Sequence, residues 1–129
     1  MNKEELYKIA CNARKNAYAK HTPYYVGAAL VTKTGKVYSG CNIQNDGLNS
    51  LCAERVAFVK SISSGEKEFS CILVVGGPTM DTLERCLPCG ICRQFMSEFV
   101  DEDFKVIVGS PENFEEFGIK ELLPHSFNL

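Results

Sequence analysis

The sequence predicts an α/β fold formed by one domain that spans residues 1–129. Helix-type and strand-type hydrophobic patterns alternate in the order helix, strand, strand, helix, strand, helix, strand, helix. One continuous apolar run, residues 71–75, is typical of a strand that is buried on both faces of a sheet. We therefore expect helices on both faces of a central sheet, with helical crossovers between strands.

The first helix is expected over residues 2–20. Asn2 is placed as its N-cap, and Glu5 follows three residues later, as in a capping box. Apolar residues recur at the spacing of one helix face: Leu6, Ile9, Ala10, Ala13 and Ala17. The segment 21–23, His-Thr-Pro, breaks this pattern and indicates the end of the helix.

The remaining elements are predicted by the same patterns and by the turn residues between them. Residues 25–31 and 36–41 flank a glycine-containing turn and are expected to form a hairpin. The polar segment 42–51 is expected to be a loop. The chain is then expected to form a helix over 52–63, the buried strand 71–75, a loop over 79–88, a helix over 90–99, a strand over 104–108 and a short helix over 119–123.

Charge and hydropathy exclude several classes of partner. The chain has 14 basic and 16 acidic residues, a net charge of −2, and the two signs are interspersed. This balance disfavours nucleic acid as a partner. No stretch approaches the roughly 18 apolar residues of a membrane span, and the N-terminus lacks the apolar region of a signal peptide. A soluble, cytoplasmic protein without a membrane partner is expected.

The spacing of the cysteines predicts a metal site. Seven cysteines without a signal peptide favour reduced thiols over a secreted disulfide framework. Cys89 and Cys92 lie in the first turn of one expected helix, and Cys52 begins another. Helix starts favour the thiolate form, which is the form that binds zinc. Three protein ligands leave one position open, as in catalytic zinc sites, where a bound water becomes acidic.

Two residues beside Cys52 suit a catalytic site. Glu54 is two residues from this ligand and is placed to move protons between the water and a substrate. Arg55 follows it, and could donate to a ligand sulfur and offset the negative charge of three thiolates. An alternative from the spacing alone is a structural four-cysteine site, because Cys86 stands three residues before Cys89. Such a site would make the protein a non-enzymatic module.

Together these segments carry a family resemblance. Cys-Ala-Glu-Arg at residues 52–55, followed by Pro-Cys-Gly-Ile-Cys-Arg-Gln at 88–94, resembles the zinc-dependent cytidine deaminase family, in its small homotetrameric form. Residues 26–30, 40–43 and 121–127 resemble the family pattern in the same order, so the likeness covers nearly the whole chain. It implies a three-layer α-β-α sandwich with a mixed central sheet of about five strands, and one Zn²⁺ per subunit.

The resemblance also implies an activity. Such enzymes hydrolyse cytidine or deoxycytidine to the uridine product and ammonia, in pyrimidine salvage. Glu54 would be the catalytic proton carrier, and Cys52, Cys89 and Cys92 the zinc ligands. Tyr24 would lie beside the base, Ala53 would offer its backbone to the base, and Asn42 would bind the ribose. Phe127 would approach the active site of a neighbouring subunit in a homotetramer with shared sites.

The sequence departs from the family at the sugar-binding segment. Gln44 stands where the family has a glutamate, and an amide carbonyl accepts a weaker hydrogen bond than a carboxylate. The loop over 44–52 is about one residue shorter than the usual pattern and lacks its tyrosine. Blasticidin S deaminase resembles this arrangement too, so a related aminopyrimidine nucleoside is the alternative substrate.

Overall fold

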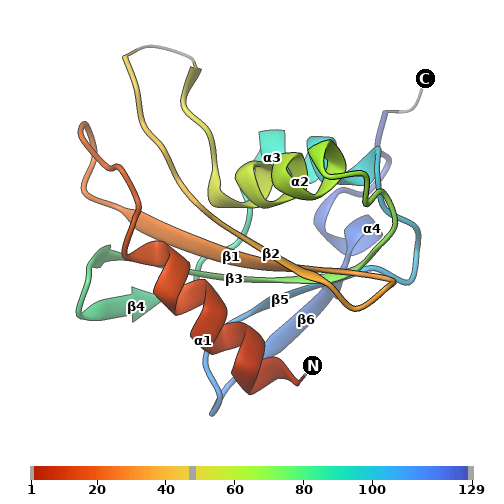
Figure 1. The fold of residues 1–129 in the computed structure, drawn as a ribbon, viewed down its shortest axis with the longest axis horizontal. Helices are drawn as coiled ribbons and strands as arrows, with labels where there is room; N and C mark the ends of the chain where they lie inside the picture. Colours follow the sequence, from red (N-terminus) through yellow and green to blue (C-terminus); the bar gives the residue numbers. More distant parts are fainter. Residues whose placement is uncertain (1, 47–48, 128–129) are drawn as a thin grey trace.

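A computed structural model describes residues 2–46 and 49–127 and shows one six-stranded sheet with helices on both faces (Figure 1). The sheet order is β2-β1-β3-β5-β6, and β4 pairs with β3 outside this path. The elements are α1 (Lys3–Arg14), β1 (Tyr25–Thr32), β2 (Val37–Cys41), α2 (Ala53–Ser63), β3 (Phe69–Thr79), β4 (Thr82–Glu84), α3 (Gly90–Ser97), β5 (Lys105–Val108), β6 (Glu115–Gly118) and α4 (Ile119–Leu122).

The sheet is mixed. β1 pairs antiparallel with β2 and with β3, and β5 pairs antiparallel with β6, whereas β3 and β5 are parallel. Among these described strands, the only crossover between parallel neighbours runs from β3 through α3 to β5. The expected α/β class and mixed sheet are confirmed, with six strands rather than about five.

Three layers follow from the alternation of side chains along the strands. In β3, Ile72 and Val74 are buried in the cluster formed with α2, α3 and α4. Leu73 and Val75 point to the opposite face and pack with α1. Figure 1 shows α1 on one side of the sheet and the other three helices on the other side. The apolar run therefore is the doubly buried strand that the sequence predicts.

A close approach at Gly40 fixes where α2 lies. A Cβ atom at Gly40 would lie 2.5 Å from the carbonyl oxygen of Ala53 and 2.7 Å from the backbone nitrogen of Ala57. Because glycine has no Cβ, the first turn of α2 rests directly on β2. This contact places Ala53, and with it the start of α2, against the sheet.

The first helix is shorter than expected. It ends at Arg14 rather than near residue 20. Tyr18 then donates its backbone N–H to the carbonyl of Asn42 at 3.0 Å and forms a β-bridge with Ile43. This pairing draws the chain out of the helical path, although the apolar spacing continues as far as Ala17.

Two short strands also differ from expectation. β4 lies within the segment 79–88 that was expected to be a loop, and β6 is too polar in sequence to be recognised as a strand. The loop over 42–51 includes residues 47 and 48, which lie outside the described residues. The helix α3 ends at Ser97, two residues earlier than expected.

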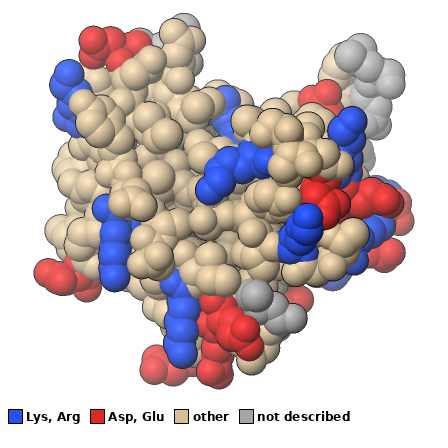
Figure 2. Space-filling view, viewed as in Figure 1, with Lys and Arg blue, Asp and Glu red and all other residues tan. Residues whose placement is uncertain are grey.

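No helix among the described residues is long and apolar enough to cross a membrane. On the face drawn in Figure 2, basic and acidic side chains lie near one another around a largely uncharged centre. This surface agrees with the interspersed charges of the sequence.

Candidate active site

Three thiols meet where two helices begin. The Sγ atoms of Cys52 and Cys89 are 3.6 Å apart, and those of Cys89 and Cys92 are 3.5 Å apart. All three sulfurs lie within 4.8 Å of one another. Tetrahedral zinc with Zn–S bonds of about 2.3 Å holds two sulfurs about 3.8 Å apart. The three cysteines therefore fit a zinc site, as the sequence predicts.

Helix geometry explains how the thiols come together. Cys52 is the N-cap of α2 and Cys89 is the N-cap of α3, both with extended backbones. Cys92 lies in the first turn of α3. The free N–H groups and the dipole at each helix start favour negative charge on the sulfurs. Both helix starts therefore suit thiolates, which bind zinc.

The ionisation of the thiols agrees with this arrangement. Hydrogen bonding from the thiol of Cys92 lowers the pKa of Cys52, and Cys89 and Arg55 add to the effect. The same hydrogen bond and burial raise the pKa of Cys92. Cys52 is therefore the sulfur of this pair that deprotonates more readily, which suits a ligand for a cation.

Arg55 lies against the sulfur cluster. Its Nη2 donates to the carbonyl oxygen of Ser50 at 2.9 Å and lies 4.0 Å from the Sγ of Cys52. Its Nε is buried and has no hydrogen-bond partner among the residues that the structure describes. A half-buried guanidinium with a buried, unused N–H beside the thiols suits a centre that carries excess negative charge, as a zinc ion with three thiolates does.

Glu54 is a buried carboxyl group beside the thiols. The residue is only 4 % exposed, and it lies in the first turn of α2. Burial raises the pKa of Glu54 to about 7, and the negative charge of Cys52 adds to the rise. A carboxyl group in this environment is suited to carry a proton at neutral pH.

Glu54 and two of the thiols open into one cavity of about 310 Å³. The cavity also includes four of the residues that the sequence assigns to substrate: Tyr24, Asn42, Gln44 and Ala53. Its other lining residues are Val26, Ser50, Leu51, Cys86 and Leu87. The cavity therefore joins the metal cluster to the predicted substrate residues, which come from the residue before β1, the loop after β2 and the start of α2.

Comparison with known proteins identifies the family. Residues 1–109 match the family model described as the cytidine and deoxycytidylate deaminase zinc-binding region. The chain belongs to the cytidine deaminase family. It is 41 % identical over 130 residues to a cytidine deaminase of Halalkalibacterium halodurans, covering 98 % of this chain and 95 % of the relative. It is 32 % identical to a blasticidin-S deaminase of Bacillus cereus, covering 93 % of this chain and 88 % of the relative.

The fold agrees with this membership. The crystal structure of cytidine deaminase from Burkholderia pseudomallei superposes with a TM-score of 0.88 at 37 % identity, covering 98 % of this chain and all of that one. The cytidine deaminase fold, the family's zinc-binding region and the Cys52, Cys89 and Cys92 cluster together define a zinc centre.

Cys86 lies in the cavity but outside the metal cluster. Among the described residues, the metal-binding group consists of Cys52, Cys89 and Cys92 alone. A Cβ atom built at Gly76 would lie 2.7 Å from the Sγ of Cys86, which shows that this thiol is directed toward β3. Burial raises the pKa of Cys86 to about 11, with the charge of Glu54 adding to the rise. The four-cysteine alternative is therefore wrong.

Cys86 is also a cavity residue that the sequence reasoning did not assign. One feature of the sequence indicates its separate position. Leu87-Pro88 follows Cys86 and turns the chain before the ligand Cys89, so Cys86 lines the cavity without joining the ligands. Burial is the main cause of a raised pKa at Tyr24, and Cys86 and Glu84 contribute. Tyr24 and Cys86 thus form one wall of the cavity of this deaminase-family chain.

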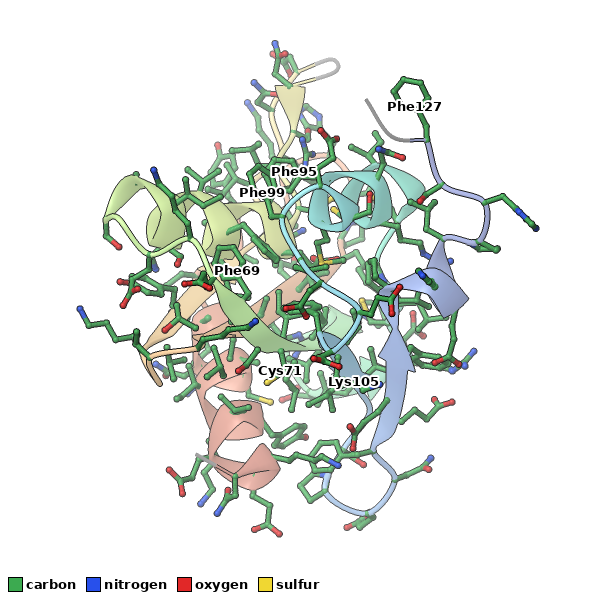
Figure 3. The ribbon with its side chains drawn as sticks, turned by 90° about the vertical axis from the view of Figure 1, so that its right-hand side faces the viewer. Phe69, Cys71, Phe95, Phe99, Lys105 and Phe127 are labelled. Atoms are coloured by element: carbon green, nitrogen blue, oxygen red, sulfur yellow. The ribbon has the colours of Figure 1, made fainter. Side chains whose placement is uncertain are left out.

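Phe127 is the predicted substrate residue that the structure does not bring to the cavity. Its side chain is 66 % exposed. Figure 3 shows it on the C-terminal segment, pointing away from the sheet. Its carbonyl oxygen accepts a 3.4 Å hydrogen bond from Gln94 of α3. Phe127 therefore does not line the active-site cavity of its own chain.

Proposed function

We propose that this protein hydrolyses cytidine or deoxycytidine to the corresponding uridine nucleoside and ammonia. The observation that carries the proposal is the meeting, at one cavity, of the buried carboxyl group of Glu54 and a three-thiol cluster, two of whose cysteines line that cavity. Curated relatives that are 37–41 % identical over nearly the whole chain bear the name cytidine deaminase. The cavity of about 310 Å³ is of a size that suits a small molecule.

Cys52, Cys89 and Cys92 would hold zinc, which would supply an acidified water as the nucleophile. In the proposed reaction Glu54 takes a proton from the attacking water and gives it to the ring nitrogen N3. It then carries the proton of the hydroxyl group added at C4 to the amine, which leaves as ammonia. Its burial excludes bulk water, so the proton passes to the substrate rather than to solvent. The positive charge of Arg55, whose Nη2 lies 4.0 Å from the Sγ of Cys52, stabilises the thiolate form of Cys52.

The remaining cavity residues are proposed to hold the nucleoside. Tyr24 would pack beside the base, and the backbone of Ala53 would bind its polar edge. The amide of Asn42 is already oriented, because its Oδ1 accepts from the N–H of Val26 and its Nδ2 donates to the carbonyl of Tyr24, both at 2.8 Å. Asn42 keeps one acceptor site and one N–H for a sugar hydroxyl.

The second candidate substrate is a related aminopyrimidine nucleoside such as blasticidin S. The neutral residue Gln44 at the sugar-binding segment favours it, and the relative from Bacillus cereus is named a blasticidin-S deaminase. The proposed chemistry at C4 of the ring is the same for both substrates.

Ammonia release from zinc-loaded protein tests the proposal. Cytidine, deoxycytidine, cytosine and blasticidin S are offered in parallel, and the isosteric variant Glu54→Gln is the blank. We expect turnover of the plain nucleosides and a loss of about 10³-fold in kcat for the variant, with zinc content unchanged. Glu112→Gln, at an exposed position, is the matched control. Full activity in Glu54→Gln would refute the role of this carboxyl group.

We also propose that four copies assemble and that Phe127 completes the active site of a neighbouring subunit. Its exposed aromatic ring supports this, since a phenylalanine gains by leaving water. A cytoplasmic location and a role in pyrimidine salvage are part of the same proposal; the seven cysteines, all free, support a reducing compartment.

A further inference from the structure

The side chain of Gln44 is fully engaged with the backbone of the segment before β1. Its Oε1 accepts hydrogen bonds from the N–H groups of His21 and Thr22, both at 2.9 Å. Its Nε2 donates to the carbonyl oxygen of Thr22, also at 2.9 Å. An amide oxygen has two lone pairs, so both acceptor sites of Gln44 are used and one N–H remains.

These three bonds fix a stretch of chain that forms a cavity wall. The carbonyl of Thr22 also accepts from the N–H of Tyr24 at 2.8 Å. The backbone N–H of Gln44 donates to the carbonyl of Tyr18 at 2.8 Å. Gln44 therefore binds the chain on both sides of residues 19–20, and through Thr22 it holds Tyr24 in the cavity.

The polar groups left for a sugar are neutral. Among the described residues that line the cavity, the only carboxylate is Glu54, which lies beside the thiols. Asn42 retains one acceptor site, and the Oγ of Ser50 is bonded to the backbone of Asn45. A sugar hydroxyl that donates a hydrogen bond consequently finds no charged acceptor and no free acceptor on Gln44.

We propose that Gln44 is a positioning residue that holds the His21–Thr22 backbone and Tyr24, and that it makes no acceptor contact with the sugar. It therefore does not discriminate between pyrimidine nucleosides that carry sugar hydroxyls and those that lack them. This inference rests on the proposed nucleoside deaminase function and concerns the specificity of the same cavity.

A cycle of enzyme and substrate changes tests the inference. Values of kcat/KM are measured for cytidine and 2′,3′-dideoxycytidine, with the parent protein and with Gln44→Met, which cannot make the three hydrogen bonds. A positioning role predicts that the variant loses activity on both nucleosides by the same factor, about tenfold, because the lost contact does not involve the sugar. A loss that is threefold or more greater for cytidine, or no loss on either nucleoside, overturns the inference.

The near-isosteric variant Gln44→Glu provides an independent test. It keeps an oxygen for the N–H groups of His21 and Thr22, but its second oxygen cannot donate to the Thr22 carbonyl and faces it as one acceptor faces another. We expect the variant to lose activity on cytidine and on the dideoxy analogue by the same factor, because the weakened hold on this backbone does not involve the sugar. A preference for cytidine that changes threefold or more overturns the inference, and this comparison decides alone if Gln44→Met does not fold.

The same assays separate the two proposals. Zinc content and thermal unfolding of each variant show whether the fold and the metal site are intact. If the zinc-loaded parent releases ammonia from neither nucleoside, the proposed function fails and the specificity inference falls with it. If the parent turns over cytidine, the proposed function stands. The ratio of kcat/KM for the two nucleosides in each variant then tests the proposed role of Gln44.

Discussion

Cys86 and Cys89 stand three residues apart and both line the active-site cavity, yet only Cys89 belongs to the thiol cluster. Replacing a ligand removes one of three metal bonds, whereas Cys86 makes none. We expect Cys89→Ser to bind well under half a zinc ion per chain after dialysis and Cys86→Ser to keep about one. Metal analysis of the purified variants measures this.

Each variant is the control for the other, because both replace a cavity thiol by a hydroxyl group. Loss of zinc from Cys86→Ser would return Cys86 to the ligand set. Retention of zinc by Cys89→Ser would show that the cluster does not hold the metal through this sulfur.

The identity of the metal ligands could be predicted from sequence because local geometry decides it. A C-x-x-C pair in the first turn of a helix places both sulfurs on one side, whatever the rest of the fold. The role of Gln44 could not, because its hydrogen-bond partners, His21 and Thr22, lie more than twenty residues away. The sequence identified the departure at Gln44 but not the backbone segment that occupies its amide.

At the scale of the elements, the contact between α2 and β2 depends on one missing side chain. In Gly40→Ala the new methyl group would meet the Ala53 carbonyl and the Ala57 nitrogen, which are backbone atoms and cannot rotate away. We expect a loss of about 2 kcal/mol in the free energy of unfolding, measured with urea. Weaker zinc binding should accompany it, because the displaced helix carries Cys52 at its N-cap.

Gly90→Ala is the matched control for stability, since a Cβ atom at Gly90 would meet no other atom within 4 Å. An equal loss of stability in the two variants would show that Gly40 matters through chain flexibility rather than through the close approach.

The turn between β3 and β4 depends on a side chain from α1. Arg14 is 3 % exposed and donates hydrogen bonds to four carbonyl groups. These belong to Tyr25, Thr79, Met80 and Thr82. Arg14→Leu leaves these carbonyls without the donor, so we expect a loss of about 3 kcal/mol or more in stability. Urea unfolding checks the loss, and hydrogen exchange should show earlier opening of residues 79–84.

A matched variant is Arg85→Leu, which removes an exposed guanidinium that pairs with Glu115. Its expected cost is below about 1 kcal/mol. If the two arginine variants unfold at the same urea concentration, the carbonyl contacts of Arg14 do not stabilise the fold as argued.

The same contacts explain why the elements were only partly predictable. α1 follows from its hydrophobic spacing and β3 from its continuous apolar run. α2 follows from the polar loop before it and from Ser64-Gly65, which ends it. β4 has three exposed residues and no hydrophobic alternation, and it pairs with β3 beside the turn that Arg14 holds. Because β4 depends on hydrogen bonds from Arg14, which is more than sixty residues away, its own sequence carries no pattern that predicts a strand.

At the scale of the whole molecule, the exposed apolar side chains bear on assembly. Val59 on α2, Ile91 on α3, Phe99 just after α3 and Phe127 are each more than two-fifths exposed. We expect light scattering to give about four times the chain mass of 14.3 kDa. Phe127→Ala should raise the KM for cytidine about tenfold or more, because the variant deprives the neighbouring cavity of an aromatic wall.

Met80→Ala is the control, since it removes an exposed apolar side chain from the turn between β3 and β4, outside this set. A monomeric mass for the parent protein would contradict both the assembly and the role of Phe127 in a neighbouring subunit. A tetramer in which Phe127→Ala leaves KM unchanged would contradict the second alone.

The two helix starts that carry the thiols are separated by much of the chain. Cys52 and Cys89 are 37 residues apart, and β3 and β4 lie between them. A metal ion bound to both acts as a reversible cross-link that closes this loop, and so reduces the freedom of the unfolded chain. α3 has only eight residues, too few for a helix to persist alone in water. Because α3 also packs into the core through Cys92 and Met96, zinc binding and the packing of α3 stabilise one another, and removal of zinc should lower the stability of the chain as well as its activity.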